Sequence, residues 1–150
     1  MCYNVVSIPD EDIQYLNERL QTKEQMSAED ALNSIAELEN FYMAVKIGIN
    51  GEPSEMIDKA WHAHILNTPM YFNFCKTIFG KYLHHLPFWS GNMQSVDAAL
   101  VSSARSVYEH LEQLGIQSLN KTVWTFRYPQ TKPTAGEHKN EVISEEVVHV

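Results

Sequence analysis

The sequence predicts an all-α protein, a compact bundle of about five helices with a short extended segment and a flexible C-terminal tail. Two observations carry this prediction. Apolar residues recur every three or four positions through five segments, and only short links separate these segments. The chain has 150 residues with 44% hydrophobic content, which is enough for one domain with its own core. We therefore expect a single helical domain over 1–128 and a tail over 129–150.

Capping and breaking residues set the expected ends of the helices. Ser27 is placed to cap the second helix, and Thr68-Pro69 is typical of the start of the fourth. Gly80 is one possible end of that fourth helix, and Gly115 is placed to end the fifth. The five helices are expected at 10–23, 27–48, 54–66, 69–79 and 95–115.

Side chains on one face of each helix are expected to form the core. Three acidic residues open the first helix, where they complement the helix dipole. The stripe expected to be buried on the second helix is Leu32, Ile35, Leu38, Tyr42 and Val45. Large aromatics at helical spacing are best explained as core, and this set is Trp61, Tyr71, Phe72, Phe74, Phe79 and Tyr82.

Beyond the fifth helix the pattern changes. The run KTVWTFRYP, 121–129, alternates two kinds of side chain and predicts one short extended segment. The remaining tail is polar with a small apolar finish, so we expect it to be flexible alone or laid along a partner. Its apolar residues amid acids suit strand addition to another chain, which makes 129–150 a candidate for protein binding or self-association.

Charge and cysteine usage exclude several classes of protein. The net charge of −8 argues against binding to nucleic acid or to an anionic membrane, because both need a surplus of Lys and Arg. Cys2 and Cys75 have the spacing of neither a zinc pair nor a disulfide framework. The first residues lack the features of a secretory signal, so we expect a cytoplasmic protein.

Four of the seven histidines lie between Asp58 and Pro87, as two close pairs. Asp58 and His62 are four residues apart, which puts both on one face of a helix. If the third and fourth helices form an antiparallel pair, the end of the fourth returns beside this face. The sequence then predicts a zinc or iron(II) site with an open position. Its candidate ligands are Asp58, His62, His64, His84 and His85, of which His64 joins only if the helix unwinds.

Structural explanations for the same residues remain open. Asp58 and His62 can form a simple hydrogen bond on a helix surface, and histidines near a helix C-terminus are favoured by the dipole without any metal. Cys75 is more typical of a small buried hydrophobe than of a nucleophile paired with His85. The histidine pairs also allow a pH switch, which no specific feature favours.

The same region resembles a known family. Trp61-His62-x-His64, then Phe74-Cys75, then His84-His85-x-Pro87 follow in the order of a signature in the glycine-rich domain-containing protein-like family. Asn67 departs from this signature, since many relatives carry aspartate there, and the glycine-rich tail of larger members is absent. The resemblance implies a compact, mostly helical module with a shared polar site, and it supplies no activity.

Two hypotheses of function follow from the sequence. The first is a small cytoplasmic helical domain with a His/Asp metal site, used for metal-dependent hydrolysis or oxygen chemistry on an unknown substrate. The alternative is a non-catalytic adaptor or structural interaction module that binds partners through its C-terminal tail. Whether the protein is an enzyme is left open by the sequence.

Overall fold

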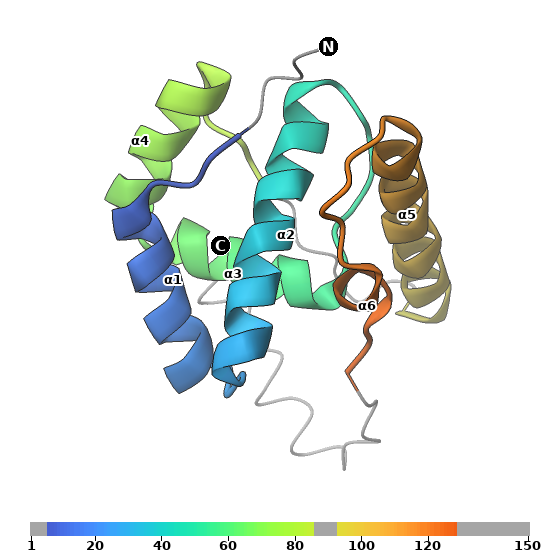
Figure 1. Cartoon of the computed structure of the whole chain (residues 1–150), viewed down its shortest axis with the longest axis horizontal. Helices are drawn as coiled ribbons and strands as arrows, with labels where there is room; N and C mark the ends of the chain where they lie inside the picture. The colour runs from blue at the N-terminus through green and yellow to red at the C-terminus, as the bar shows by residue number, and fades with distance from the viewer. Residues whose placement is uncertain (1–5, 86–92, 129–150) are drawn as a thin grey trace.

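The computed structural model describes residues 6–85 and 93–128, and within these ranges all regular structure is helical (Figure 1). This confirms the predicted all-α fold class. The helices of the described ranges are α1 (Asp10–Thr22), α2 (Ala28–Lys46), α3 (Glu55–Leu66), α4 (Thr68–Phe79), α5 (Met93–Gln113) and α6 (Lys121–Thr125). The predicted tail, 129–150, and its proposed role in binding lie outside the described residues.

Helix α2 forms the centre of the bundle. It packs against α1, α3, α5 and α6, and α3 crosses behind it in the view of Figure 1. Helices α1 and α4 lie on one side of α2, and α5 and α6 lie on the other. Side chains at the two ends of α3 therefore have different neighbours, α1 and α4 on one side of α2 and α6 on the other.

Local sequence explains where the helices start and stop. The Ser27 side chain accepts a hydrogen bond of 3.1 Å from the backbone N–H of Asp30, which confirms the predicted cap of α2. Helix α4 ends at Gly80, whose φ of 72° is the left-handed conformation that glycine adopts without strain. Its first residue is Thr68 rather than Pro69, because Asn67 takes the capping position.

The core lies on both sides of α2. The largest fully buried apolar side chains come from helices α1 to α5 and include Leu16, Leu20, Leu38, Tyr42, Ile57, Tyr71 and Leu111. Leu32 and Phe72 were predicted to be buried, and both predictions are wrong, since each is 51% exposed. Leu32 directly follows the buried Ala31, so the helical rotation of about 100° per residue turns it away from the packed face.

The predicted extended segment at 121–129 is also wrong, because its first five residues form helix α6. The side chain of Asn120 caps this helix by accepting a 3.3 Å hydrogen bond from the N–H of Val123. Only after α6 does the chain extend, with φ −66° and ψ 138° at Phe126. Val123 and Trp124 are both buried, so one helical turn seals this side of α2.

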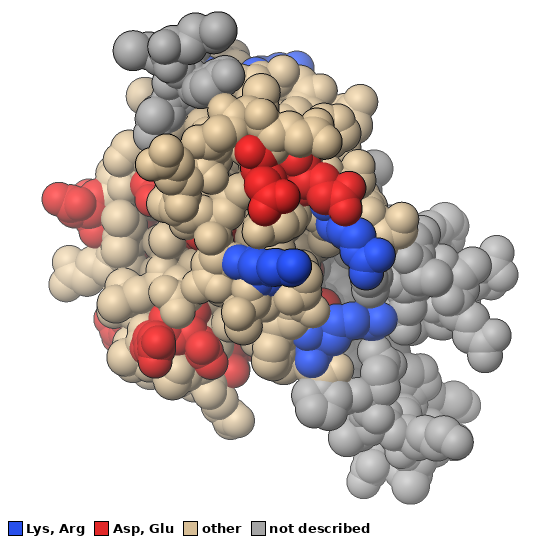
Figure 2. All heavy atoms as spheres, turned by 45° about the vertical axis from the view of Figure 1, so that its right-hand side comes forward, with Lys and Arg blue, Asp and Glu red and all other residues tan. Residues whose placement is uncertain are grey.

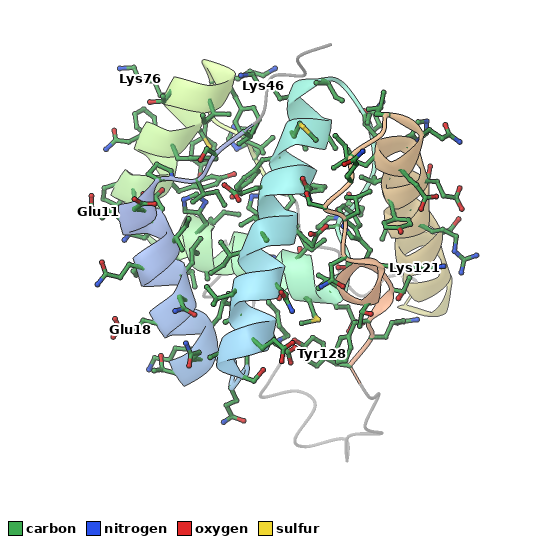
Figure 3. All side chains as sticks on the ribbon, viewed as in Figure 1. Glu11, Glu18, Lys46, Lys76, Lys121 and Tyr128 are labelled. Atoms are coloured by element: carbon green, nitrogen blue, oxygen red, sulfur yellow. The ribbon has the colours of Figure 1, made fainter. Side chains whose placement is uncertain are left out.

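The surface carries charges of both signs. On the face shown in Figure 2, acidic and basic side chains lie in small groups next to one another. Glu11 and Glu18 of α1 point away from the bundle, whereas the interior side chains fill the space between the helices (Figure 3). Among the helices that the structure describes, none combines the length and apolar character needed to span a lipid bilayer.

Candidate metal centre

Three of the predicted ligands meet at the first turns of α3. Asp58 and His62 lie four residues apart on this helix, with 3.4 Å between Asp58 Oδ2 and His62 Nε2. His85 reaches them from the non-helical segment that follows α4. Its Nε2 lies 2.6 Å from His62 Nε2 and 2.9 Å from Asp58 Oδ1. We call this group of Asp58, His62 and His85 the α3 cluster.

The route by which His85 arrives differs from the one predicted. Helix α4 stops at Phe79, and residues 81–85, rather than a longer helix, carry the chain back to α3. Two hydrogen bonds fix this return. Trp61 Nε1 donates to the Tyr71 hydroxyl at 2.9 Å, and that hydroxyl donates to the Leu83 carbonyl at 2.6 Å. The Trp61 ring then stacks on the His85 ring, with 4.2 Å between the ring centroids and an angle of 8° between the ring planes.

The α3 cluster is accessible but not fully exposed. The side chains are 8% exposed for His85, 21% for His62 and 32% for Asp58. The ring of His85 is therefore held between Trp61 and His62, while Asp58 keeps a solvent-facing edge. Such a site can retain an ion and still admit a small molecule from one side.

Hydrogen bonds alone do not account for all the short contacts in the α3 cluster. His85 Nε2 lies within bonding distance of two acceptor-capable atoms, Asp58 Oδ1 and His62 Nε2. One Nε2 carries at most one hydrogen, which points in a single direction in the plane of the ring. A cation between the three atoms would bind a lone pair of each. Two imidazoles and one carboxylate, with their donor atoms within 4.8 Å of one another, are a ligand set for zinc or iron.

The two other predicted ligands, His64 and His84, do not belong to the α3 cluster. His84 is exposed, and its ring lies against Tyr82 at 4.7 Å. His64 is fully buried on a different face of α3. It follows His62 by two residues, which corresponds to a rotation of about 200° around the helix axis. Since α3 is regular through this point, the unwinding that would bring His64 to the cluster does not occur.

His64 forms a separate buried network with α1 and α2. Its Nε2 lies 2.8 Å from Asp12 Oδ2, and its Nδ1 lies 2.7 Å from the Tyr42 hydroxyl. Burial lowers the pKa of His64, although the Asp12 carboxylate opposes this effect, and burial raises the pKa of Tyr42 well above its usual value. A neutral ring that donates to Asp12 and accepts from Tyr42 satisfies every partner.

Comparison with known protein families gives a match, which includes the region of the α3 cluster. The model of the UCP032817-like family matches residues 10–122. The chain belongs to the UCP032817-like family. That match covers helices α1 to α5, all three residues of the α3 cluster and the buried His64 network. No curated protein and no solved structure matches the chain.

The resemblance to the glycine-rich domain-containing protein-like family is wrong. The matching model is that of the UCP032817-like family, and no glycine-rich domain family is indicated. The signature residues have structural roles that explain their spacing without that relationship. Trp61 and His64 pack in the core, and Phe74 and Cys75 are buried beside them. The description of the UCP032817-like family names no activity, substrate or cofactor.

Cys75 is a buried free thiol, as expected of a small hydrophobe. Burial raises the pKa of this thiol, which keeps it protonated, and a protonated thiol is a poor nucleophile. The alternative of a Cys75–His85 nucleophilic pair therefore has no support in this member of the UCP032817-like family, because His85 is engaged in the α3 cluster.

Sequence reasoning missed one residue of this region, Glu52. Burial raises the pKa of its carboxyl group, and the nearby Asp58 raises it further while His85 lowers it. Glu52 lies in the turn before α3, which the sequence marks only as a break between helices. The signal that could have found it is its position six residues before Asp58, just ahead of the helix that carries the cluster.

Proposed function

We propose that the protein is a divalent-metal-binding helical domain and that Asp58, His62 and His85 bind one ion. The observation that supports this most is the convergence of three metal-binding atoms from two separate parts of the chain. Holding two imidazoles against a carboxylate is useful for a cation and has little value for packing alone. Zinc and iron(II) both accept this set of ligands, so the proposal covers either metal.

Three protein ligands leave at least one coordination position for water or substrate. A zinc ion in such a site lowers the pKa of bound water and supports hydrolysis, whereas an iron(II) ion supports oxygen chemistry. The protein's part would be to hold the three ligands and to limit solvent around His85, which Trp61 covers. A reducing compartment such as the cytoplasm fits the unpaired Cys75.

Metal analysis of the full chain, purified without a histidine tag, tests the proposal. We expect about one zinc or iron per chain after dialysis, and loss of this metal in His62→Ala and in His85→Ala. His84→Ala is the matched control, because it removes the neighbouring exposed ring that lies outside the α3 cluster. It should retain the metal.

Thermal unfolding gives an independent measure of the same site. A ligand that binds only the folded state stabilises it by about 2.7 kcal/mol at a free concentration one hundred times Kd. Added zinc should therefore raise the Tm of the wild type and of His84→Ala but not of His62→Ala. A wild-type protein that binds neither metal and shows no such rise would refute the metal centre.

A further inference from the structure

The indole of Trp61 connects α3 to residues 81–85, which carry His85. Trp61 directly precedes His62 on α3 and is 5% exposed. Its ring stacks on that of His85, with 4.2 Å between the centroids and 8° between the planes, and it also packs on Phe41 of α2. The lone pair of a histidine Nε2 lies in the plane of its ring. A stacked neighbour that fixes this plane therefore restricts the direction from which His85 can bind an ion.

Tyr71 fixes the backbone of the same segment. Its side chain comes from α4 and is fully buried. The hydroxyl accepts a hydrogen bond of 2.9 Å from Trp61 Nε1 and donates one of 2.6 Å to the carbonyl oxygen of Leu83, two residues before His85. A phenol carries a single hydrogen, so both bonds form together only in one arrangement of the three groups. Tyr71 thus links the ring that covers His85 to the chain that carries it.

These contacts do not involve the three ligand atoms. His85 Nε2 has two short contacts, to Asp58 and to His62, so hydrogen bonding within the cluster leaves its ring a choice of partner. The stack on Trp61 and the hydrogen bonds of Tyr71 are the same in either case and need no ion. A side chain that is already held in its binding geometry loses less conformational freedom when a ligand binds, which increases affinity.

We propose that Tyr71 and Trp61 are positioning residues of the metal centre, which hold His85 in its binding geometry before an ion arrives. This inference rests on the metal site proposed above. Phenylalanine would fill the space of Tyr71 without adding a hydroxyl that burial obliges the protein to satisfy. The hydroxyl is therefore the part of Tyr71 that packing does not explain, and its two bonds lead to the chain and to the indole that hold His85.

Nuclear magnetic resonance of the metal-free full chain tests whether His85 is held in advance. The face of an indole shields protons that lie over it, so the ring protons of His85 should resonate upfield of those of the exposed His110. Comparison with His85→Ala assigns these signals. We expect the upfield shift to shrink in Tyr71→Phe, because residues 81–85 lose the bond to Leu83. An unchanged shift in this variant would overturn the inference.

Zinc affinity, measured by competition with a chromophoric chelator, tests the consequence for the metal centre. We expect Tyr71→Phe to bind zinc about 10–100-fold more weakly than the wild type, the usual effect of losing a residue that orients a ligand. Tyr82→Phe is the matched control. Tyr82 lies in the same segment and packs edge-on against Tyr71, but its hydroxyl forms neither of the bonds described above. It should bind zinc as the wild type does, and an equal loss in both variants would overturn the role of the Tyr71 hydroxyl.

Trp61→Phe provides a second test, which carries the inference if Tyr71→Phe does not fold. It removes the indole N–H and should also weaken zinc binding and reduce the upfield shift of His85. Urea unfolding of the metal-free variants separates positioning from a purely structural role. Lower stability with unchanged zinc affinity and an unchanged shift would mean that both residues serve only the fold, and would refute the positioning role alone. Failure of the wild type to bind zinc or iron would refute the metal centre and this inference with it.

Discussion

Two histidines separated by a single residue have unrelated surroundings in this protein. His62 faces the segment that follows α4, where it meets His85, while His64 faces α1 and α2. The helix alone produces this division, because residues two positions apart on an α-helix are rotated by about 200° around its axis. The Trp-His-x-His run thus contains one ligand of the proposed metal centre, His62, and one buried structural histidine, His64, while Trp61 and Ala63 of the same run lie in the core.

The buried His64 network should contribute measurably to stability. Tyr42→Phe removes the hydroxyl that donates to His64 Nδ1 and leaves that nitrogen without its partner in the core. We expect the free energy of unfolding to fall by about 1–3 kcal/mol, the penalty of an unsatisfied buried polar group. Urea unfolding measures this effect. Tyr15→Phe, at a half-buried position, is the control, and an equal loss in both variants would show that the network contributes nothing specific.

The described helices show which parts of an element can be predicted from sequence. The start of α2 was predictable because Ser27 has a direct capping role, and the end of α4 because Gly80 takes a left-handed conformation. Helix α6 was not, because alternation over a few residues fits a strand as well as one helical turn. The choice of a helical turn over a strand depends on a tertiary contact, the 2.7 Å hydrogen bond that Trp124 Nε1 donates to the buried Glu37 carboxylate.

The caps of α2 and α3 should respond differently to the same substitution. Ser27 Oγ accepts a hydrogen bond from the helix, so Ser27→Ala should destabilise the protein by about 1 kcal/mol. Ser54 also occupies a capping position, but its buried hydroxyl has no hydrogen-bond partner among the residues that the structure describes. Ser54→Ala removes this unsatisfied group and should leave stability unchanged or raise it. Chemical denaturation of the two variants compares them, and a larger loss in Ser54→Ala would contradict this view of the two caps.

At the scale of the whole molecule, the sequence predicted the composition of the core better than the site. Periodicity places Leu38, Tyr42 and Leu111 inside because a helix buries one face whatever its neighbour is. The α3 cluster depends on where residues 81–85 run, and no local pattern encodes that path. Asp58 and His62 were predictable as a pair, whereas the choice of His85 over His84 required the hydrogen bond from Tyr71 to Leu83.

The bundle as a whole should lose stability in alkali. Burial raises the pKa of Tyr42 and Tyr71 above the value of an exposed phenol, so the folded state favours their neutral forms. This contribution is complete below the unfolded pKa of about 10 and is lost as the pH rises toward the folded pKa, at about 1.4 kcal/mol per pH unit for each phenol. Urea unfolding at about pH 9 and about pH 11 measures it. A steady free energy of unfolding across this interval would contradict the prediction.

The short helix α6 defines how much chain the protein needs in order to fold. The family match stops at residue 122, yet Val123 and Trp124 are only 2% and 3% exposed. A fragment trimmed to the matched segment would uncover the side of α2 that these residues seal and would deprive the Glu37 carboxylate of its indole donor. The boundary of sequence similarity therefore falls inside the hydrophobic core, and a minimal folding unit has to extend past it through Tyr128, whose N–H bonds to Glu55 at the start of α3.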